Sequence, residues 1–182
     1  MVASADLGSI WMRPALAMLV LIVLIAVGIP LVATMSGPSG VLPDPQIAAA
    51  TFRYQFQHNA SGLRASAAAY CIGYGAFGPD ADSNKNRTDP PQEVLIALAD
   101  VVPAVKPYSQ CSHTKEQGVR DKASGKRALI FTLRSMECSE PLKCRVDGGY
   151  YEGGESASGN SYFLERRDGK WLVIGDKMHW IS

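Results

Sequence analysis

Proton transfer is the chemistry for which this chain has the most suitable side chains. It requires an acid or base whose pKa is displaced by its surroundings, and a hydrogen-bond donor that faces the reacting group. A strand tyrosine, however, more often lies in a core, and a lone histidine is usually a surface group. No motif connects the candidates, so we assign no catalytic residue. The candidates for a pocket wall are Tyr54, His58, Tyr70, Tyr150, Asp176 and His179.

Aromatic side chains in the C-terminal third form a second kind of candidate, an interaction surface. Tyr150 and Tyr151 are adjacent, so on a strand their side chains must point to opposite faces. The outward-facing tyrosine, together with Trp171 or Trp180, would form an aromatic patch of the kind that is enriched at protein interfaces.

The spacing of other residues disfavours several classes of site. The glycine-rich run 148–154 precedes a turn, so it lacks the helix N-terminus that would hold a phosphate. Asp80 and Asp82 lack the rest of a calcium-loop pattern. No G-x-S-x-G elbow indicates a hydrolase, and no C-x-x-C or H-x-x-x-H spacing indicates a zinc site. We therefore expect neither a metal nor a cofactor.

The four cysteines predict two disulfides if the domain lies in an oxidising compartment. Three pairings are formally possible. We favour Cys138 with Cys144, which are close in sequence, and Cys71 with Cys111, which would tie the first half of the domain to its middle. Buried free thiols are the alternative.

Residues 14–35 contain no charged side chain and are long enough, as a helix, to cross the roughly 30 Å apolar core of a membrane. Arg13 lies directly before this segment, and the next cation is Arg53. This asymmetry predicts a cytoplasmic N-terminus and an exported C-terminal domain, periplasmic or extracellular. A cleaved signal peptide is the alternative, and it would export the same domain.

The predicted organisation is a cytoplasmic tail (1–13), a transmembrane helix (14–35), a Gly/Pro/Ser linker (36–43) and one exported domain (44–182). Beyond residue 13 the chain has 17 Lys and Arg against 16 Asp and Glu, so it is almost neutral. Nucleic acid is therefore not an expected partner, because binding phosphates requires an excess of clustered cations.

Helices and strands of the domain can be placed from capping and periodicity. Asp44-Pro45 predicts the start of a helix over 45–58, and Asp89-Pro90-Pro91 the start of a second over 92–99. A strand is expected at 66–74, followed by a polar surface loop at 75–89. From residue 126 the apolar residues alternate, which predicts an antiparallel meander. Its strands are expected at 127–135, 143–152, 160–167 and 170–174, with Asp168-Gly169 as a hairpin turn, a bulge at Gly175 and a last strand through Trp180.

The element order, the hairpin YFLERRDGKWLVIGD and the ending MHWIS resemble the nuclear-transport-factor-2-like (NTF2-like), cystatin-related group of folds. The resemblance implies an α+β fold in which helices pack on one face of a curved antiparallel sheet. In that group the sheet and helices can enclose a pocket, and some members are isomerases or dehydratases.

We therefore expect a single-pass membrane protein of the cell envelope whose exported domain binds or assembles with a protein partner, in the manner of anchored scaffold subunits of secretion systems. The alternative is a small-molecule-binding or isomerase- or dehydratase-like enzyme that uses the pocket of the domain. A spacer domain is a third reading. The oligomeric state is left unassigned.

Overall fold

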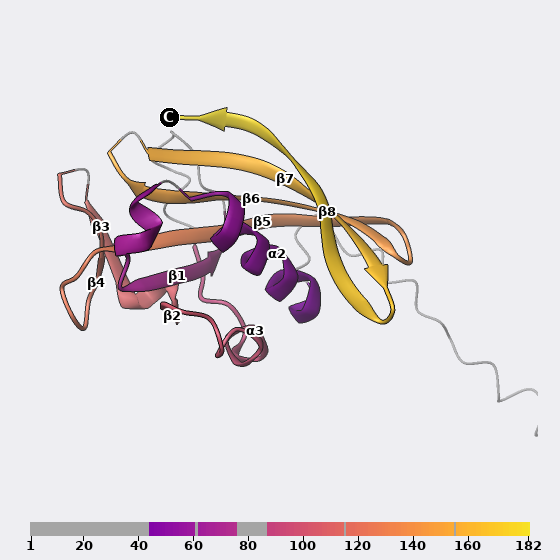
Figure 1. Cartoon of the computed structure of the whole chain (residues 1–182), viewed down its shortest axis with the longest axis horizontal. Coiled ribbons are helices and arrows are strands. Elements are labelled where there is room, and N and C mark those ends of the chain that lie inside the picture. The colour runs from indigo at the N-terminus through magenta and orange to yellow at the C-terminus, as the bar shows by residue number, and fades with distance from the viewer. Residues whose placement is uncertain (1–43, 61, 76–86, 115, 155) are drawn as a thin grey trace, which may run out of the picture. The chain divides into compact units, whose positions relative to one another are not determined.

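A computed structural model describes residues 44–60, 62–75, 87–114, 116–154 and 156–182 (Figure 1). The expected tail, apolar segment and linker, and most of the expected polar loop, lie outside the described residues. Among the described residues, no helix is both long and apolar enough to cross a membrane.

The first helix, α2 (Pro45–His58), begins where the sequence predicts. Asp44 caps it by accepting a hydrogen bond from the backbone N–H of Gln46 at 2.8 Å, which satisfies one of the free donors of the first turn. The buried face of α2 is centred on Ala48, Phe52 and Phe56, which recur every four residues.

A six-stranded sheet forms the body of the domain, in the order β2-β1-β5-β6-β7-β8, and β3 and β4 form a separate antiparallel pair. In Figure 1, β5 to β8 are the long strands of a meander, and β8 (yellow) curves along one edge. A short helix, α3 (Gln92–Ala97), precedes β2 and packs against α2. The strands are β1 (Ala69–Tyr74), β2 (Ala104–Pro107), β3 (Cys111–Thr114), β4 (Gly118–Asp121), β5 (Ala128–Glu140), β6 (Lys143–Gly153), β7 (Ser156–Arg167) and β8 (Lys170–Ile181); the 3₁₀ turns are η1 (Gly62–Ser66) and η3 (Tyr108–Gln110).

The expected fold class, a transmembrane helix followed by helices on an antiparallel sheet, is wrong. The domain is mostly strand, and its sheet is mixed because β1 pairs in parallel with both β2 and β5. The chain leaves β1 and returns to each neighbour in the same direction through long connections, which is the requirement for parallel pairing. Residues 14–35 lie outside the described range, and the described residues contain no transmembrane helix.

The missed elements, β2, β3 and β4, are each four residues long. Pro107 is the last residue of β2. Proline is tolerated there because β2 is an edge strand and needs no donor on its outer side.

The two faces of the sheet are covered differently. One face packs on α2 through side chains of β1, β5, β6 and β7, among them Ile72, Phe131, Val146 and Tyr162. The opposite face of β1 and β5 is covered by the β3–β4 hairpin, and a small core that includes Val119 and Ile130 lies there. Over the remaining part of that opposite face, on β6, β7 and β8, the side chains of Phe163, Leu172 and Ile174 are exposed. We call this part the open face.

The meander itself follows the sequence closely. Asp168 and Gly169 adopt positive φ angles of 50° and 77°, which is the backbone of the tight hairpin turn that Asp-Gly predicts. The bulge expected at Gly175 is present, because Gly175 pairs with Phe163 while Val173 pairs with Leu164. The strands after each turn are longer than expected, and the expected last two strands are one continuous β8.

Both favoured disulfides are present. Cys71 on β1 bonds to Cys111 on β3, and Cys138 bonds to Cys144 across the β5–β6 turn. The first bond attaches the β3–β4 hairpin to the sheet that it covers.

Candidate functional site

Three of the predicted site residues meet where the end of α2 lies against β8. The hydroxyl of Tyr54 donates to Asp176 Oδ1 at 2.8 Å, and the ring of Tyr54 lies 4.3 Å from that of His58. Asp176 also accepts from the side-chain amide of Asn160 at 2.7 Å. Desolvation, followed by the hydrogen bond to Asp176 and its charge, raises the pKa of Tyr54. These contacts join α2 to the edge strand β8. Because Tyr54 has a raised pKa and donates a hydrogen bond to a carboxylate, it is not suited to act as a base.

The other predicted tyrosines and Trp171 belong to packing. Tyr70 and Tyr150 are buried beside Phe131 in the core under α2, and Trp171 packs at the edge of the same core. Tyr151 points to the opposite face, as expected for neighbours on a strand, and its ring lies 5.9 Å from that of His113 on the β3–β4 hairpin.

His179 and Trp180 lie together on the face opposite α2, where they line a pocket of about 320 Å³. Two further strands contribute Asp147 on β6 and Ser161 on β7, which are opposite each other in the sheet register. The imidazole Nε2 of His179 lies 2.7 Å from Ser161 Oγ. The structure thus brings His179 and Trp180 together but places them on the other face from Tyr54, His58 and Asp176.

The serine, histidine and aspartate in this pocket do not form a hydrolytic triad. In a triad the carboxylate accepts a hydrogen bond from the histidine, and the histidine accepts the serine proton. Here Asp147 accepts from the hydroxyls of both Ser161 and Ser135. The Ser161 proton is directed to the carboxylate, so His179 Nε2 must donate its own proton to Ser161 Oγ. Ser161 is also only 4% exposed, so it is not available as a nucleophile.

Two arginines lie at the same pocket, and the sequence interpretation missed them. Arg145 pairs with Glu137 at 3.1 Å and lies 3.6 Å from Asp147. Arg134 stands at a register shift in β5, between residues paired with β6, and it has no ion-pair or hydrogen-bond partner among the described residues. The sequence signal that would have identified it is a cation directly after the apolar run 128–133 of the expected strand, which only Thr132 interrupts.

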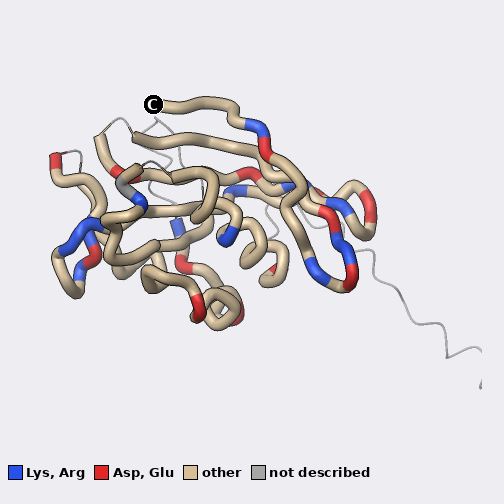
Figure 2. The backbone as a smooth tube through the Cα atoms, in the orientation of Figure 1, with Lys and Arg blue, Asp and Glu red and all other residues tan. Residues whose placement is uncertain are grey.

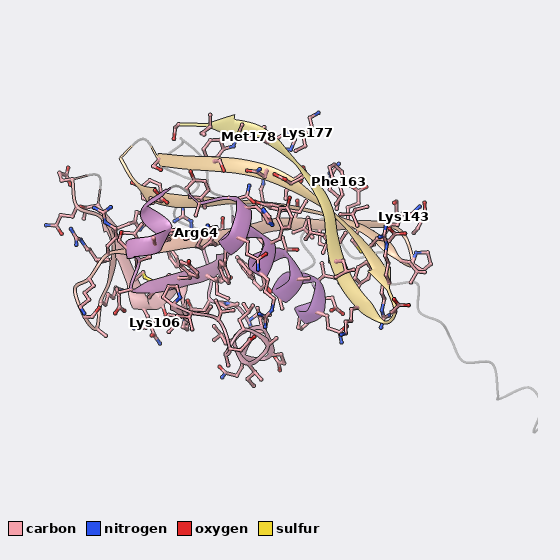
Figure 3. The ribbon with its side chains drawn as sticks, in the orientation of Figure 1. Arg64, Lys106, Lys143, Phe163, Lys177 and Met178 are labelled. Carbon is pink, nitrogen blue, oxygen red and sulfur yellow. A yellow bond between two sulfur atoms is a disulfide. The ribbon has the colours of Figure 1, made fainter. Side chains whose placement is uncertain are left out.

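An apolar groove of about 510 Å³ continues from this pocket toward the β5–β6 turn, and Arg145 lines both. Its apolar wall is formed by Phe163 and Ile174, which are 41% and 54% exposed. Figure 3 labels Phe163 and Lys143 in this part of the sheet. The signal in the sequence is that β8 carries apolar residues on both faces, Trp171 and Val173 inward and Leu172 and Ile174 outward.

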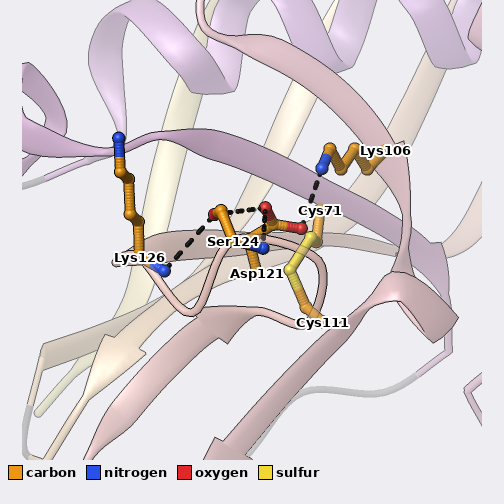
Figure 4. Close-up of polar contacts among 6 residues, drawn as sticks. All are labelled: Cys71, Lys106, Cys111, Asp121, Ser124 and Lys126. Atoms are coloured by element: carbon orange, nitrogen blue, oxygen red, sulfur yellow. Dashed lines mark hydrogen bonds and ion pairs between the residues drawn. A yellow bond between two sulfur atoms is a disulfide. The ribbon is translucent and has the colours of Figure 1, made fainter.

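A third polar cluster holds the β3–β4 hairpin in place (Figure 4). Asp121 is buried, and it accepts from Lys106 Nζ on β2 at 2.8 Å and from Ser124 Oγ at 2.6 Å. These hydrogen bonds, with that of Lys106 first, lower the pKa of Asp121 to about 2. Every partner is a neighbouring structural element, so we interpret this cluster as an internal brace of the hairpin.

Among the described residues, no three histidine, cysteine, aspartate or glutamate side chains are grouped so that they could hold a metal ion. A comparison with known proteins finds no matching family model, no matching curated protein and no matching solved structure. The NTF2-like resemblance therefore stays a prediction, and function must be argued from the open face and its pocket.

Proposed function

We propose that this is a membrane-anchored protein of the cell envelope whose C-terminal domain binds an acidic protein partner through the open face. The observation that carries the proposal is the cluster of large apolar side chains, Phe163, Leu172 and Ile174, exposed on one side of β7 and β8. Large apolar side chains that are exposed together on a sheet are typical of surfaces that a partner covers.

The charges around these residues favour a partner with negative charge. The carboxylates of this part of the sheet already have cationic neighbours: Glu137 and Asp147 share Arg145, Glu140 pairs with Lys143, and Glu165 pairs with Arg167. The cations Arg134 and Lys177, by contrast, have no ion-pair partner among the described residues. Figure 2 shows charged residues of both signs gathered at the ends of the β5–β6 and β7–β8 hairpins. The surplus charge that a partner would meet here is positive.

Support for the location comes from the disulfides and the N-terminal segment. Two disulfides and no free cysteine are typical of domains that fold in an oxidising compartment. The uncharged segment 14–35 supplies an anchor, and anchoring raises the local concentration of a domain relative to partners in the same membrane.

The enzyme alternative has less support. Tyr70 and Tyr150 contribute to the packed core, and the Tyr54–Asp176 pair joins α2 to β8 at the surface. The serine, histidine and aspartate of the pocket have the hydrogen-bond order described above, which leaves no base directed at Ser161.

Site-specific photo-crosslinking in membranes of the native cells tests the proposal. A photoreactive amino acid at position 163 or 174 is expected to form the same discrete adduct, whereas position 96, on α3, is a matched exposed apolar control. The adduct is expected to weaken when the salt concentration rises from about 0.05 to about 0.5 M, because the partner is acidic.

Mass spectrometry should place the crosslink beside acidic residues of the partner. Three results would contradict the proposal: an equal amount of adduct at position 96, an amount of adduct that does not change with salt concentration, or no adduct at either 163 or 174.

A further inference from the structure

The pocket at the end of the open face is lined by charged and polar side chains, which an apolar docking surface does not require. Arg134, Arg145 and Trp180 lie around it, and Thr132 lies at its buried end. Arg134 projects from a register shift in β5, where the regular alternation of the strand is interrupted. Arg134 is two residues from Thr132, so both lie on the pocket face of β5, and the shift places Ser135 beside Asp147 on that face as well.

Two further hydrogen-bond donors at the pocket have no partner within the described part of the chain. Thr132 is only 1% exposed, and its hydroxyl oxygen has no hydrogen bond among the described residues. The indole N–H of Trp180 likewise has no partner in the described structure, although Trp180 lines the pocket. A buried hydroxyl without a partner destabilises the fold, so a ligand that forms a hydrogen bond with it removes that penalty.

Asp147 is the acidic side chain in this lining, and its oxygens already have hydrogen-bond donors. Its two oxygens accept from Ser135 Oγ and Ser161 Oγ, and Arg145 lies beside it. Arg145 is shared between Asp147 and Glu137, and the pocket lining itself holds two guanidinium groups, Arg134 and Arg145, against the one carboxylate of Asp147.

We propose that this pocket binds a carboxylate of the protein partner, with Arg134 as its charged anchor and Thr132 and Trp180 as hydrogen-bond donors. The inference rests on the proposed function and names the chemical group that the open face selects. Guanidinium groups bind carboxylates with strong, directional hydrogen bonds, which suits them to this task.

The neighbouring apolar groove indicates which second side chain of the partner binds beside the carboxylate. Ser161 lines the pocket and Phe163 lines the groove, and they lie two residues apart on the same face of β7. That separation is roughly 7 Å along a strand. A partner segment with an acidic and an apolar side chain at that spacing fits both, as at positions i and i+2 of an extended segment.

A pair of small probes tests this inference on the full chain in detergent. N-acetyl-L-phenylalanine carries a phenyl ring and a carboxylate, and N-acetyl-L-phenylalaninamide is the same molecule without the charge. The readout is the indole N–H resonance of Trp180, assigned by its loss in Trp180→Phe. We expect the carboxylate probe to shift this resonance and the amide to bind about tenfold more weakly.

Two variants separate a binding role from a structural one. Arg134→Gln is expected to weaken binding of the carboxylate probe about tenfold. Arg127→Gln, which replaces an exposed arginine directly before β5, is expected to leave binding unchanged. Thr132→Val keeps the shape of the side chain and removes the hydroxyl that has no partner among the described residues. It should weaken binding of the carboxylate probe, while the melting temperature stays equal or rises. Equal binding of both probes, or an Arg134→Gln variant that binds like the wild type, would overturn the inference.

The same variants keep this inference distinct from the proposed function. If Arg134→Gln leaves the crosslink at position 163 intact and the probes bind equally, the open face docks a partner without a carboxylate contact. If the probe results are as expected but no crosslink forms, the pocket binds carboxylates and the docking proposal is the part that fails.

Discussion

At the scale of single residues, two aspartates connect parts of the chain that are distant in sequence. Asp176 on β8 accepts from Tyr54 on α2, and Asp121 at the end of β4 accepts from Lys106 on β2. Both are acceptors for neighbouring donors, but Asp121 is buried while Asp176 is exposed. The consequence for stability is therefore clearest at Asp121.

The lowered pKa of Asp121 predicts how acid affects the domain. An aspartate has a pKa near 3.9 when unfolded, and in the folded domain the value is about 2. A carboxylate with a lowered folded pKa stabilises the fold fully above its unfolded pKa, and this contribution is lost as the pH falls toward the folded value. Asp121 should therefore stabilise the domain above about pH 4 and lose that effect between about pH 4 and pH 2.

Urea denaturation of Asp121→Asn at a series of pH values measures this effect. The variant should be less stable than the wild type at pH 7, and the difference should shrink as the pH falls from about 4 to about 2. Asp168→Asn, at the β7–β8 turn, is the control, because asparagine also tolerates the positive φ of that residue. A difference between wild type and Asp121→Asn that stays constant over this pH range would contradict the prediction.

At the scale of elements, the geometry of the pocket depends on how β7 and β8 pack. The register shifts between Gly159 and Asn160, opposite a bulge in β8 that contains His179. The indole ring of Trp180 then lies directly over Gly159, where a side chain would collide with it. Glycine at 159 is therefore required for Trp180 to line the pocket.

Gly159→Ala is expected to displace the indole ring and to destabilise the domain by about 1–3 kcal/mol, the usual cost of overpacking. The Trp180 indole resonance should shift, and affinity for the carboxylate probe should fall. Gly175→Ala is the matched control in β8, because a Cβ at 175 meets nothing within 4 Å. Similar effects of the two substitutions would show that the contact between Gly159 and Trp180 is unimportant.

At the scale of the whole molecule, the proposal places the domain outside the compartment that holds the N-terminus. The orientation is predicted by the distribution of cations, because Arg13 directly precedes the apolar segment and the next cation is Arg53. All four cysteines are bonded, so the domain has no native thiol that would react with a labelling reagent.

This bonding makes a clean topology experiment feasible. A cysteine introduced at the exposed C-terminal residue, Ser182→Cys, should react with a membrane-impermeant maleimide in intact cells, and Ser4→Cys should react only after the membrane is opened. The unmodified chain, whose cysteines are bonded, should remain unlabelled. Labelling of Ser4→Cys but not Ser182→Cys in intact cells would reverse the proposed orientation.

Local signals in the sequence determined the elements whose causes lie within a few residues. Asp44-Pro45 determined the start of α2, Asp168-Gly169 determined the β7–β8 turn, and alternation placed the strands of the meander. The short separation of Cys138 and Cys144 likewise favoured their bond. Each of these depends on the backbone preferences or reach of neighbouring residues.

Only the tertiary structure decided the features that depend on distant pairing. β1 lies between β2 and β5 in parallel, and no local pattern specifies its partners. The β3–β4 hairpin covers one part of the sheet and leaves Phe163 and Ile174 exposed on the other. The predicted site residues divide between two faces because Asp176 and His179 are three residues apart on β8, so alternation sends their side chains to opposite sides. The bulge at His179 then leaves Trp180 on the same side as His179, opposite Gly159. A sequence shows which side chains alternate, but which face of the sheet is covered depends on contacts between segments that are distant in sequence.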